Sequence, residues 1–414
     1  MKKWYFDSMD TTLDNGLRVL TIKRDTQIAS LQIGIKAGPL YEDIEEKGIS
    51  HFIEHMLFKG TLSRNNEELN NELECLGGEY NAYTDYSCTV YSITALEEEM
   101  EKSVDILSDM LINSTLPKEE LEKERGVILA EIRTSKDDLE DFSFKRLNEV
   151  AFHKSPLRYD IIGNEENVKK FSRKILIDYY KKNYVPNNAV IVLVSSYDHE
   201  EALDLIKTYF NNWQYCEVKI KDIIKENNKS TKAISYKKDI EQSTITYLYT
   251  FHDLDKNKEL PLKILNHKLG ESANSVLFRE VRENRGLAYD IYTHMDMTNN
   301  IKTLTIYTAV AEETIEEAIE AIEECIVNIK NKTIVFNKET VELMKKVHKT
   351  AVVSTLEDST DLCNYVLHQC MENEDIYEFI NDMKELQGID SEDIYEVANR
   401  VLNNPTIHIL KSEN

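Results

Sequence analysis

Residues 51–61 read His51-Phe52-Ile53-Glu54-His55-Met56-Leu57-Phe58-Lys59-Gly60-Thr61. We expect a helix over about residues 46–59, in which His51 and His55 lie on one face because residues four apart are neighbours. Glu54 follows His51 by three positions and lies close to the same face. Two imidazoles can bind one divalent cation there, with a carboxylate beside it as a base. The order His-x-x-Glu-His is the inverted, inverzincin form of the His-Glu-x-x-His metalloprotease motif.

A zinc site of this kind needs a third protein ligand and an open position for water. The helix expected over residues 117–133 places four residues on one stripe: Leu121, Glu124, Ile128 and Glu131. Carboxylates within an apolar stripe are costly to bury unless they are paired, hydrogen-bonded or bound to metal. The stripe therefore offers Glu124 and Glu131 as candidates for the third ligand, with an ordinary solvated helix face as the alternative.

These two segments resemble the active-site elements of the pitrilysin and insulinase group of zinc metallopeptidases. The closest likeness is to its short-chain branch, which includes the mitochondrial processing peptidase β-subunit and bacterial processing proteases. The distal segment Glu124-Arg125-Gly126-Val127-Ile128-Leu129-Ala130-Glu131-Ile132 fits that group, and so does its distance from His55. The resemblance implies that His51, His55 and Glu131 bind one zinc ion per chain, that Glu54 is the general base and that Glu124 steadies the site.

Residues 77–84, Gly77-Gly78-Glu79-Tyr80-Asn81-Ala82-Tyr83-Thr84, resemble the substrate-pairing edge strand of the same family. An exposed edge can bind an extended peptide by adding it as a strand. The resemblance implies substrate contacts for Gly78, Asn81, Ala82, Tyr83 and Thr84. A strand with a covered edge is the alternative. The family usually carries a glutamate where this chain has Ser87-Cys88, which leaves the local substrate contacts open.

Residues 277–289 resemble the family's C-terminal element, which brings an arginine and a tyrosine over the substrate. Arg282 and Tyr289 have the required separation. A tyrosine hydroxyl can donate a hydrogen bond to the oxyanion formed at the peptide carbonyl, and an arginine can clamp a carbonyl. The resemblance implies that this pair completes the site when the two halves of the molecule close. Without it, a surface arginine and a core tyrosine would be the simpler interpretation.

The element pattern predicts an α+β fold of two homologous domains, each a mainly antiparallel sheet with helices packed on one side. We expect a zinc-binding catalytic domain over residues 1–216, a linker over 217–232 and a second domain over 233–414. The resemblance implies that the chain forms half of a clam-like peptidase chamber.

The second half lacks a metal set of its own. His267 falls where His55 would lie in the repeat, whereas Lys263 and Asn266 replace the other two motif residues. We therefore expect a structural role for His267.

The chain of 414 residues has 50 Lys and Arg against 75 Asp and Glu, a formal net charge of −25. This charge argues against nucleic acids and anionic membranes as partners and would attract basic peptides, although solubility alone is a sufficient role for it. The sequence shows neither a signal peptide nor an apolar span, so we expect a cytoplasmic protein.

The six cysteines predict free thiols, because the sequence has no C-x-x-C pair. Cys363, His368 and Cys370 are near one another in the sequence. We expect the two thiols to be buried on a helix rather than to form a second metal site.

Together these observations predict a zinc endopeptidase acting on peptides or on unfolded, flexible protein segments, precursor processing included. Family members of this length usually pair, which implies a homodimer or a heterodimer with a related chain. The alternative is a non-catalytic subunit or scaffold of a peptidase-like heterodimer. Such relatives lose motif residues, and none is missing here. The sequence does not separate a dedicated maturation protease from a general peptidase.

Overall fold

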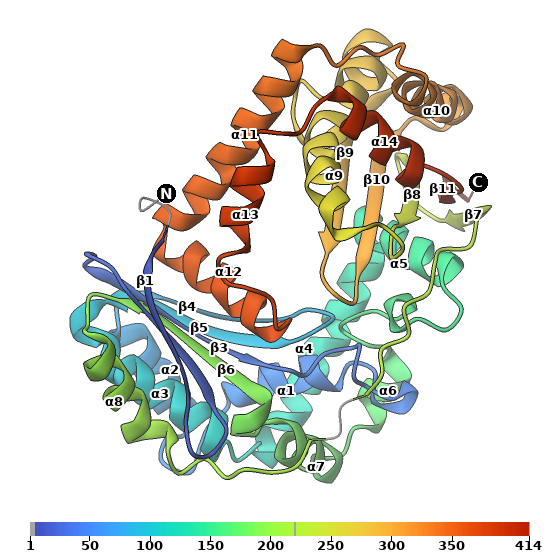
Figure 1. Cartoon of the computed structure of the whole chain (residues 1–414). Coiled ribbons are helices and arrows are strands. Elements are labelled where there is room, and N and C mark those ends of the chain that lie inside the picture. Colours follow the sequence, from blue (N-terminus) through green and yellow to red (C-terminus); the bar gives the residue numbers. More distant parts are fainter. Residues whose placement is uncertain (1–4, 219–220, 414) are drawn as a thin grey trace. The chain divides into compact units, whose positions relative to one another are not determined.

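The structure, a computed structural model, describes residues 5–218 and 221–413 and consists of two units, each built around its own sheet (Figure 1). Unit 1 takes its residues from Met1–Arg133, Asp160–Asp222 and Val353–Glu378. Unit 2 takes its residues from Thr134–Tyr159, Ile223–Val352 and Phe379–Asn414. The domains predicted from the sequence, residues 1–216 and 233–414, are each continuous along the chain. In the structure, Thr134–Tyr159 from the first half belongs to unit 2, and Val353–Glu378 from the second half belongs to unit 1.

The sheet of unit 1 has the strand order β1-β2-β6-β3-β5-β4. Its strands are β1 (Asp7–Thr12), β2 (Arg18–Lys23), β3 (Ile28–Ile35), β4 (Glu79–Thr84), β5 (Thr89–Leu96) and β6 (Ala189–Ser195). All neighbours pair antiparallel except β2 and β6, which are parallel. The dipeptide Asn15-Gly16 lies in the turn between β1 and β2, and Gly16 has the positive φ of 88° that such a turn requires.

The sheet of unit 2 repeats this arrangement with one strand fewer, in the order β7-β11-β8-β10-β9. Its strands are β7 (Thr231–Lys237), β8 (Ser243–Thr250), β9 (Ala288–Met297), β10 (Lys302–Val310) and β11 (Thr406–Ser412). The pair β7–β11 is parallel, like β2–β6, and the other pairs are antiparallel. The predicted duplication is therefore visible in both strand order and strand direction.

Fourteen α-helices lie in the described residues. Those within unit 1 are α1 (Ile49–Leu57), α2 (Asn66–Cys75), α3 (Met100–Asn113), α6 (Glu165–Lys170), α7 (Arg173–Asn183), α8 (His199–Phe210) and α12 (Ser359–Met371). Those within unit 2 are α5 (Leu139–Ala151), α9 (Glu259–Asn266), α10 (Ile315–Lys330) and α14 (Ser391–Val401). The chain passes between the units within α4 (Lys118–Asp137), α11 (Lys338–Glu357) and α13 (Glu378–Glu385).

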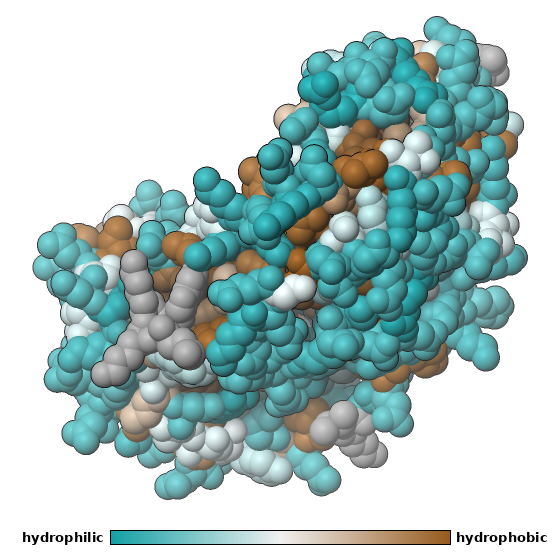
Figure 2. All heavy atoms as spheres, turned by 45° about the horizontal axis from the view of Figure 1, so that its top comes forward, coloured by the Kyte–Doolittle hydropathy of each residue, from teal (hydrophilic) through white to brown (hydrophobic). Residues whose placement is uncertain are grey.

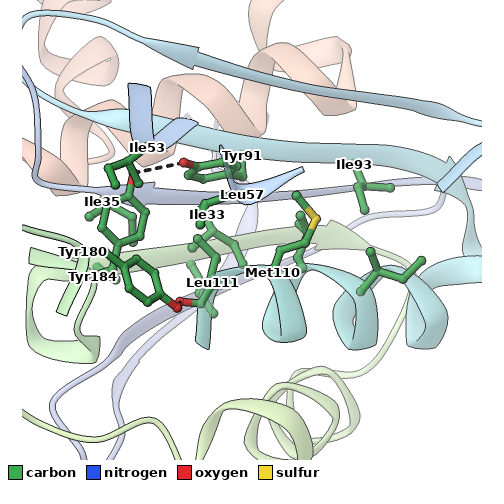
Figure 3. Packing of buried hydrophobic residues seen from close by; sticks show 14 of the residues in the cluster. Ile33, Ile35, Ile53, Leu57, Tyr91, Ile93, Met110, Leu111, Tyr180 and Tyr184 are labelled. Atoms are coloured by element: carbon green, nitrogen blue, oxygen red, sulfur yellow. Dashed lines mark hydrogen bonds between the residues drawn. The ribbon is translucent and has the colours of Figure 1, made fainter. Parts of the chain in front are cut away.

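The main core of unit 1 lies between one face of its sheet and the helices α1, α3 and α7 (Figure 3). Successive side chains of a strand alternate between the faces, so residues of β3 and β5 two apart enter this core together. The packed residues include Ile33, Ile35, Ile53, Leu57, Tyr91, Ile93, Met110 and Leu111. This packing fixes the buried side of α1 and leaves its other side for function.

Each sheet also has a helix on its opposite face. In unit 1, α12 packs on β3 and β6, where Leu362 and Val366 meet Val192 and Val194. In unit 2, α5 packs on β8 and β11, and the hydroxyls of Ser143 and Thr244 are hydrogen-bonded at 2.5 Å. These two helices occupy equivalent places in the repeat and are the segments that the two units exchange.

Hydrophilic residues predominate on the face drawn in Figure 2, and hydrophobic residues form smaller patches there. All six cysteines are free, as predicted. None of the helices over residues 5–218 and 221–413 combines the length and the apolarity needed to cross a bilayer.

Candidate metal centre

Gly48 directly precedes helix α1 as its N-cap residue, at a point where the chain comes close to a neighbouring loop. Gly48 has a φ of 94°, and a Cβ atom there would lie 2.7 Å from the carbonyl oxygen of Ile162. The buried carboxylate of Glu42 accepts hydrogen bonds from the backbone N–H groups of Gly48 and Ser50 at 3.0 and 2.9 Å. A carboxylate at this end also complements the helix dipole. The start of α1 is thus fixed by the close approach of Gly48 to Ile162 and by the hydrogen bonds to Glu42.

The structure brings the three predicted ligands together. The Nε2 atoms of His55 and His51 lie 3.6 and 4.0 Å from Oε2 of Glu131, which is on α4. The three ligand atoms all lie within 4.8 Å of one another. Two nitrogen or oxygen ligands of one tetrahedral zinc are separated by about 3.4 Å, so a small closure would suffice.

Two polar atoms of this group lack a hydrogen bond in the part of the chain that the structure describes. Among the described residues, neither Oε2 of Glu131 nor Nδ1 of His51 has a hydrogen bond, although both atoms are buried. A buried polar atom without a partner is costly. Burial lowers the pKa of His51 to about 4, which keeps its imidazole neutral, the form that binds metal. The residues therefore fit a zinc ion.

Glu124 contacts the ring nitrogen of His55 that does not face Glu131. Its Oε2 lies 3.1 Å from Nδ1 of His55, and its Oε1 lies 3.0 Å from Nζ of Lys59. Burial acts to raise the pKa of Glu124, but the hydrogen bonds with His55 and Lys59 outweigh it and hold the pKa below its usual value. An ionised Glu124 accepts a hydrogen bond from Nδ1–H of His55, which leaves the lone pair of the imidazole on Nε2, the nitrogen near Glu131.

Glu54 is held by the neighbouring sheet. Its Oε2 accepts a 2.6 Å hydrogen bond from the hydroxyl of Thr84, the last residue of β4. Burial raises the pKa of Glu54, and the hydrogen bond from Thr84 partly offsets this rise. The carboxylate predicted as the base is therefore joined to the strand predicted to bind substrate.

Strand β4 is an edge strand, as predicted, because within the described part of the chain it pairs with β5 alone. Four of the five predicted substrate-binding residues are on it, and Gly78 directly precedes it. A Cβ atom at Gly78 would lie only 2.2 Å from the carbonyl oxygen of Thr94, so only glycine fits there. The hydroxyl of Tyr83 donates to Oδ1 of Asn364 on α12 at 2.8 Å.

The structure also brings Arg282 and Tyr289 together, within unit 2. Arg282 is on a π-helix, Phe278–Asn284, an irregularity frequent at functional sites. Its guanidinium lies 4.6 Å from the ring centroid of Phe278 and 5.7 Å from that of Tyr289 on β9. Tyr289 is 74% exposed, so it is not a core residue.

The equivalent place in unit 2 holds an ion pair instead of a metal set. Nζ of Lys263 lies 3.6 Å from Oδ2 of Asp382, and Nδ1 of His267 lies 3.6 Å from Oε2 of Glu271. No group of three potential ligands includes His267 among the described residues.

One group of potential ligands was missed in the sequence. Cys363 and Cys370 are buried, as expected, but His368 on the same helix lies with Asp85 and Cys88 of the β4–β5 turn. About 280 residues separate this histidine from the turn, so no local spacing could indicate the contact.

Comparison with protein families gives two matches. Residues 18–165 match the family described as Insulinase (Peptidase family M16), and residues 170–347 match the model described as Peptidase M16 inactive domain. All residues of the candidate metal centre lie in the first match.

Similar proteins share much of the chain. An uncharacterized zinc protease of Bacillus subtilis strain 168, YmxG, is 30% identical over 351 residues, which is 84% of each chain. An uncharacterized zinc protease of Rickettsia felis is 28% identical over 410 residues, 95% of each chain. The human mitochondrial-processing peptidase β-subunit is 38% identical over 202 residues, 49% of this chain and 41% of the other.

Solved structures show the same fold. The structure of a protease from Helicobacter pylori superposes with a TM-score of 0.92 at 21% identity, covering 98% of this chain and 100% of the other. A structure described as a peptidase M16 inactive domain from Pseudomonas fluorescens has a TM-score of 0.89 at 16% identity, covering 99% and 98%.

Proposed function

The chain belongs to the insulinase family of peptidases, peptidase family M16, and on this basis we propose that it is a zinc endopeptidase. Its substrates would be peptides or unfolded, flexible protein segments, including precursors. The observation that best supports the proposal is that the ligand atoms of His51, His55 and Glu131 lie close together. Glu54 directly precedes His55.

The proposed reaction is hydrolysis of a peptide bond by water. Zinc held by the three ligands would act as a Lewis acid and would lower the pKa of the attacking water. Glu54 accepts a proton from that water and delivers it to the leaving amine nitrogen. Because Thr84 occupies Oε2 of Glu54, we assign this proton to Oε1. Glu124 touches no reacting atom and acts by positioning His55.

Substrate would bind as an added strand on the free edge of β4, through its backbone hydrogen bonds and the side chains around them. The assigned residues are Gly78, Asn81, Ala82, Tyr83 and Thr84. The exposed edge supports this assignment. For Arg282 and Tyr289 we propose the clamping and oxyanion-stabilising roles, supported by their mutual contact and by the exposure of Tyr289.

We propose one catalytic zinc per chain and a dimer, either with a second copy or with a related chain. The name of one relative, a processing peptidase subunit, supports both a paired state and precursor processing. The scaffold alternative draws on the match to the inactive-domain model, but that match covers residues 170–347 and not the candidate centre.

The central test replaces Glu54 by glutamine and measures zinc content and cleavage of a mixed peptide library. We expect Glu54→Gln to retain about one zinc per chain at this centre and to lose turnover, because only the base is removed. Glu122→Gln is the matched control, since Glu122 is exposed on α4 and pairs with Arg125. Cleavage by Glu54→Gln at the wild-type rate would remove Glu54 from the mechanism. A wild type without zinc or activity would favour the scaffold.

A further inference from the structure

A second group of potential metal ligands lies in unit 1, apart from the candidate centre. Asp85 and Cys88 are in the turn between β4 and β5, and His368 is on α12. One ligand atom from each of these residues lies within 4.8 Å of the others. Their carboxylate, thiol and imidazole groups are three of the side chains that zinc prefers.

The geometry of the turn suits a single ion. The side-chain Sγ of Cys88 lies 3.5 Å from Oδ2 of Asp85. A thiolate and a carboxylate bound to one tetrahedral zinc are separated by about 3.5 Å, given their usual bond lengths. The other oxygen, Oδ1, accepts backbone hydrogen bonds from Ser87 and Cys88 at 2.6 and 2.7 Å. These bonds fix the carboxylate and leave Oδ2 beside the sulfur.

His368 has the supporting contact expected of a metal-bound imidazole. Such an imidazole usually donates its second ring N–H to a polar group. The phenol oxygen of Tyr83 lies 2.8 Å from Nε2 of His368, and the phenol itself donates to Oδ1 of Asn364. Tyr83 can therefore accept from Nε2–H when the imidazole binds through Nδ1.

The charges around Cys88 favour a cation. The side chain is fully buried, and burial, the carboxylate of Asp85 and that of Glu372 all raise the pKa of its thiol. Glu372 comes one helical turn after His368, at the end of α12. A bound cation would offset this concentration of negative charge, and binding would release the thiol proton.

We propose that Asp85, Cys88 and His368 bind a second divalent cation, a borderline-soft ion such as zinc, which fastens the β4–β5 turn to α12. The fourth position is left for water or for Glu372. The ion would hold the end of β4, where Tyr83 contacts His368 and Thr84 contacts Glu54. This is a structural site on the proposed substrate strand, and it does not depend on the catalytic assignment.

Cobalt substitution of the full-length protein tests the proposal, because cobalt bound to a thiolate has a charge-transfer absorption in the near ultraviolet. The candidate catalytic centre contains no cysteine, so this absorption does not report on it, and the variants below test whether it arises at Cys88. We expect the absorption to saturate at about one cobalt per Cys88, with about two cobalt ions per chain in total.

Cys88→Ser should abolish the absorption and retain about one cobalt per chain. Cys363→Ser is the matched control, since Cys363 is a buried thiol on α12 whose Sγ contacts backbone carbonyl oxygens. Its absorption should equal that of the wild type. His368→Gln, at a half-buried position, serves if Cys88→Ser fails to fold, and should also lose the absorption.

A wild type without thiolate absorption would overturn the proposal, and so would an absorption that persists in both Cys88→Ser and His368→Gln. The second result would mean that the cobalt binds another of the six free cysteines. Glu131→Gln distinguishes the two sites, because it should lower the cobalt content and keep the absorption. A fall in cobalt content without a change in absorption therefore reports loss of the catalytic ion, and loss of the absorption reports loss of the second ion.

Discussion

His55 is the residue on which most contacts of the candidate centre converge. Glu124 holds its Nδ1, Glu131 faces its Nε2, and Glu54 precedes it on α1. The three carboxylates around His55 lie in three different environments, and we therefore assign a different role to each. Glu124 is paired with Lys59, Glu54 is hydrogen-bonded to Thr84, and Oε2 of Glu131 has no hydrogen bond among the described residues.

Glu124→Gln tests the positioning role of Glu124. The amide keeps the shape of the side chain but loses its charge, so Lys59 loses an ionic partner and His55 is less firmly oriented. We expect zinc affinity to fall by about 10- to 100-fold, measured by competition with a chelator. Turnover should recover at saturating zinc, and the exposed Glu122→Gln is the control. Unchanged affinity would show that His55 needs no orienting partner.

Tyr289→Phe tests the oxyanion role. Loss of one donor to the oxyanion typically costs about 10²- to 10³-fold in kcat. We expect a reduction of that order, with zinc content and thermal stability unchanged because the side chain is 74% exposed. Steady-state kinetics with a peptide found in the library would measure it. A kcat equal to that of the wild type would remove Tyr289 from the mechanism.

Strand β4 connects three features of unit 1. Within the described residues it is one of the two edge strands of the sheet, it holds Glu54 through Thr84, and it contacts α12 through Tyr83. Its position depends on Gly78, where the backbone meets that of β5. The strand can bind substrate in a fixed register only if this contact remains close.

Two glycine substitutions distinguish the effect of steric crowding on the free energy of unfolding from the effect of backbone entropy. In Gly78→Ala the new methyl group would lie 2.2 Å from the carbonyl oxygen of Thr94, so β4 must move. We expect a loss of about 1–3 kcal/mol of unfolding free energy and a lower kcat/KM. Gly126→Ala, on α4 with no atom within 4 Å of its Cβ, should instead gain about 0.5–1 kcal/mol. Thermal denaturation measures both, and equal effects of the two changes would contradict this account of Gly78.

The sequence predicted those elements whose evidence is local. The His51-to-His55 spacing places two candidate ligands on one helix face, and the edge strand expected within residues 77–84 is observed as β4, Glu79–Thr84. Helix α5 was not predicted, and of α12 only a helix with the buried Cys363 and Cys370 was expected, because each helix covers a sheet whose strands come from the other half of the chain. The contacts of Thr84 with Glu54 and of His368 with Cys88 likewise depend on the fold, which no periodicity reports.

The net charge of −25 belongs to the molecule as a whole and gives a prediction about substrates. If it attracts basic peptides, kcat/KM for a basic peptide should fall as salt is raised toward about 0.15 M, where the Debye length is about 8 Å. A neutral peptide of the same length should show little change. Equal salt dependence for the two peptides would assign the charge to solubility alone.

The exchange of α5 and α12 constrains any attempt to divide this protein. A gene cut within residues 217–232 would encode one fragment containing α5 but not α12, and another containing α12 but not α5. Each product would then leave an apolar or buried sheet face open while carrying a helix that has no sheet to cover. Such fragments should aggregate when made separately and should recover a folded state only by complementation, when both are made together. Folding of the two duplicated halves should therefore be interdependent, even though the candidate ligands His51, His55 and Glu131 all come from one of them.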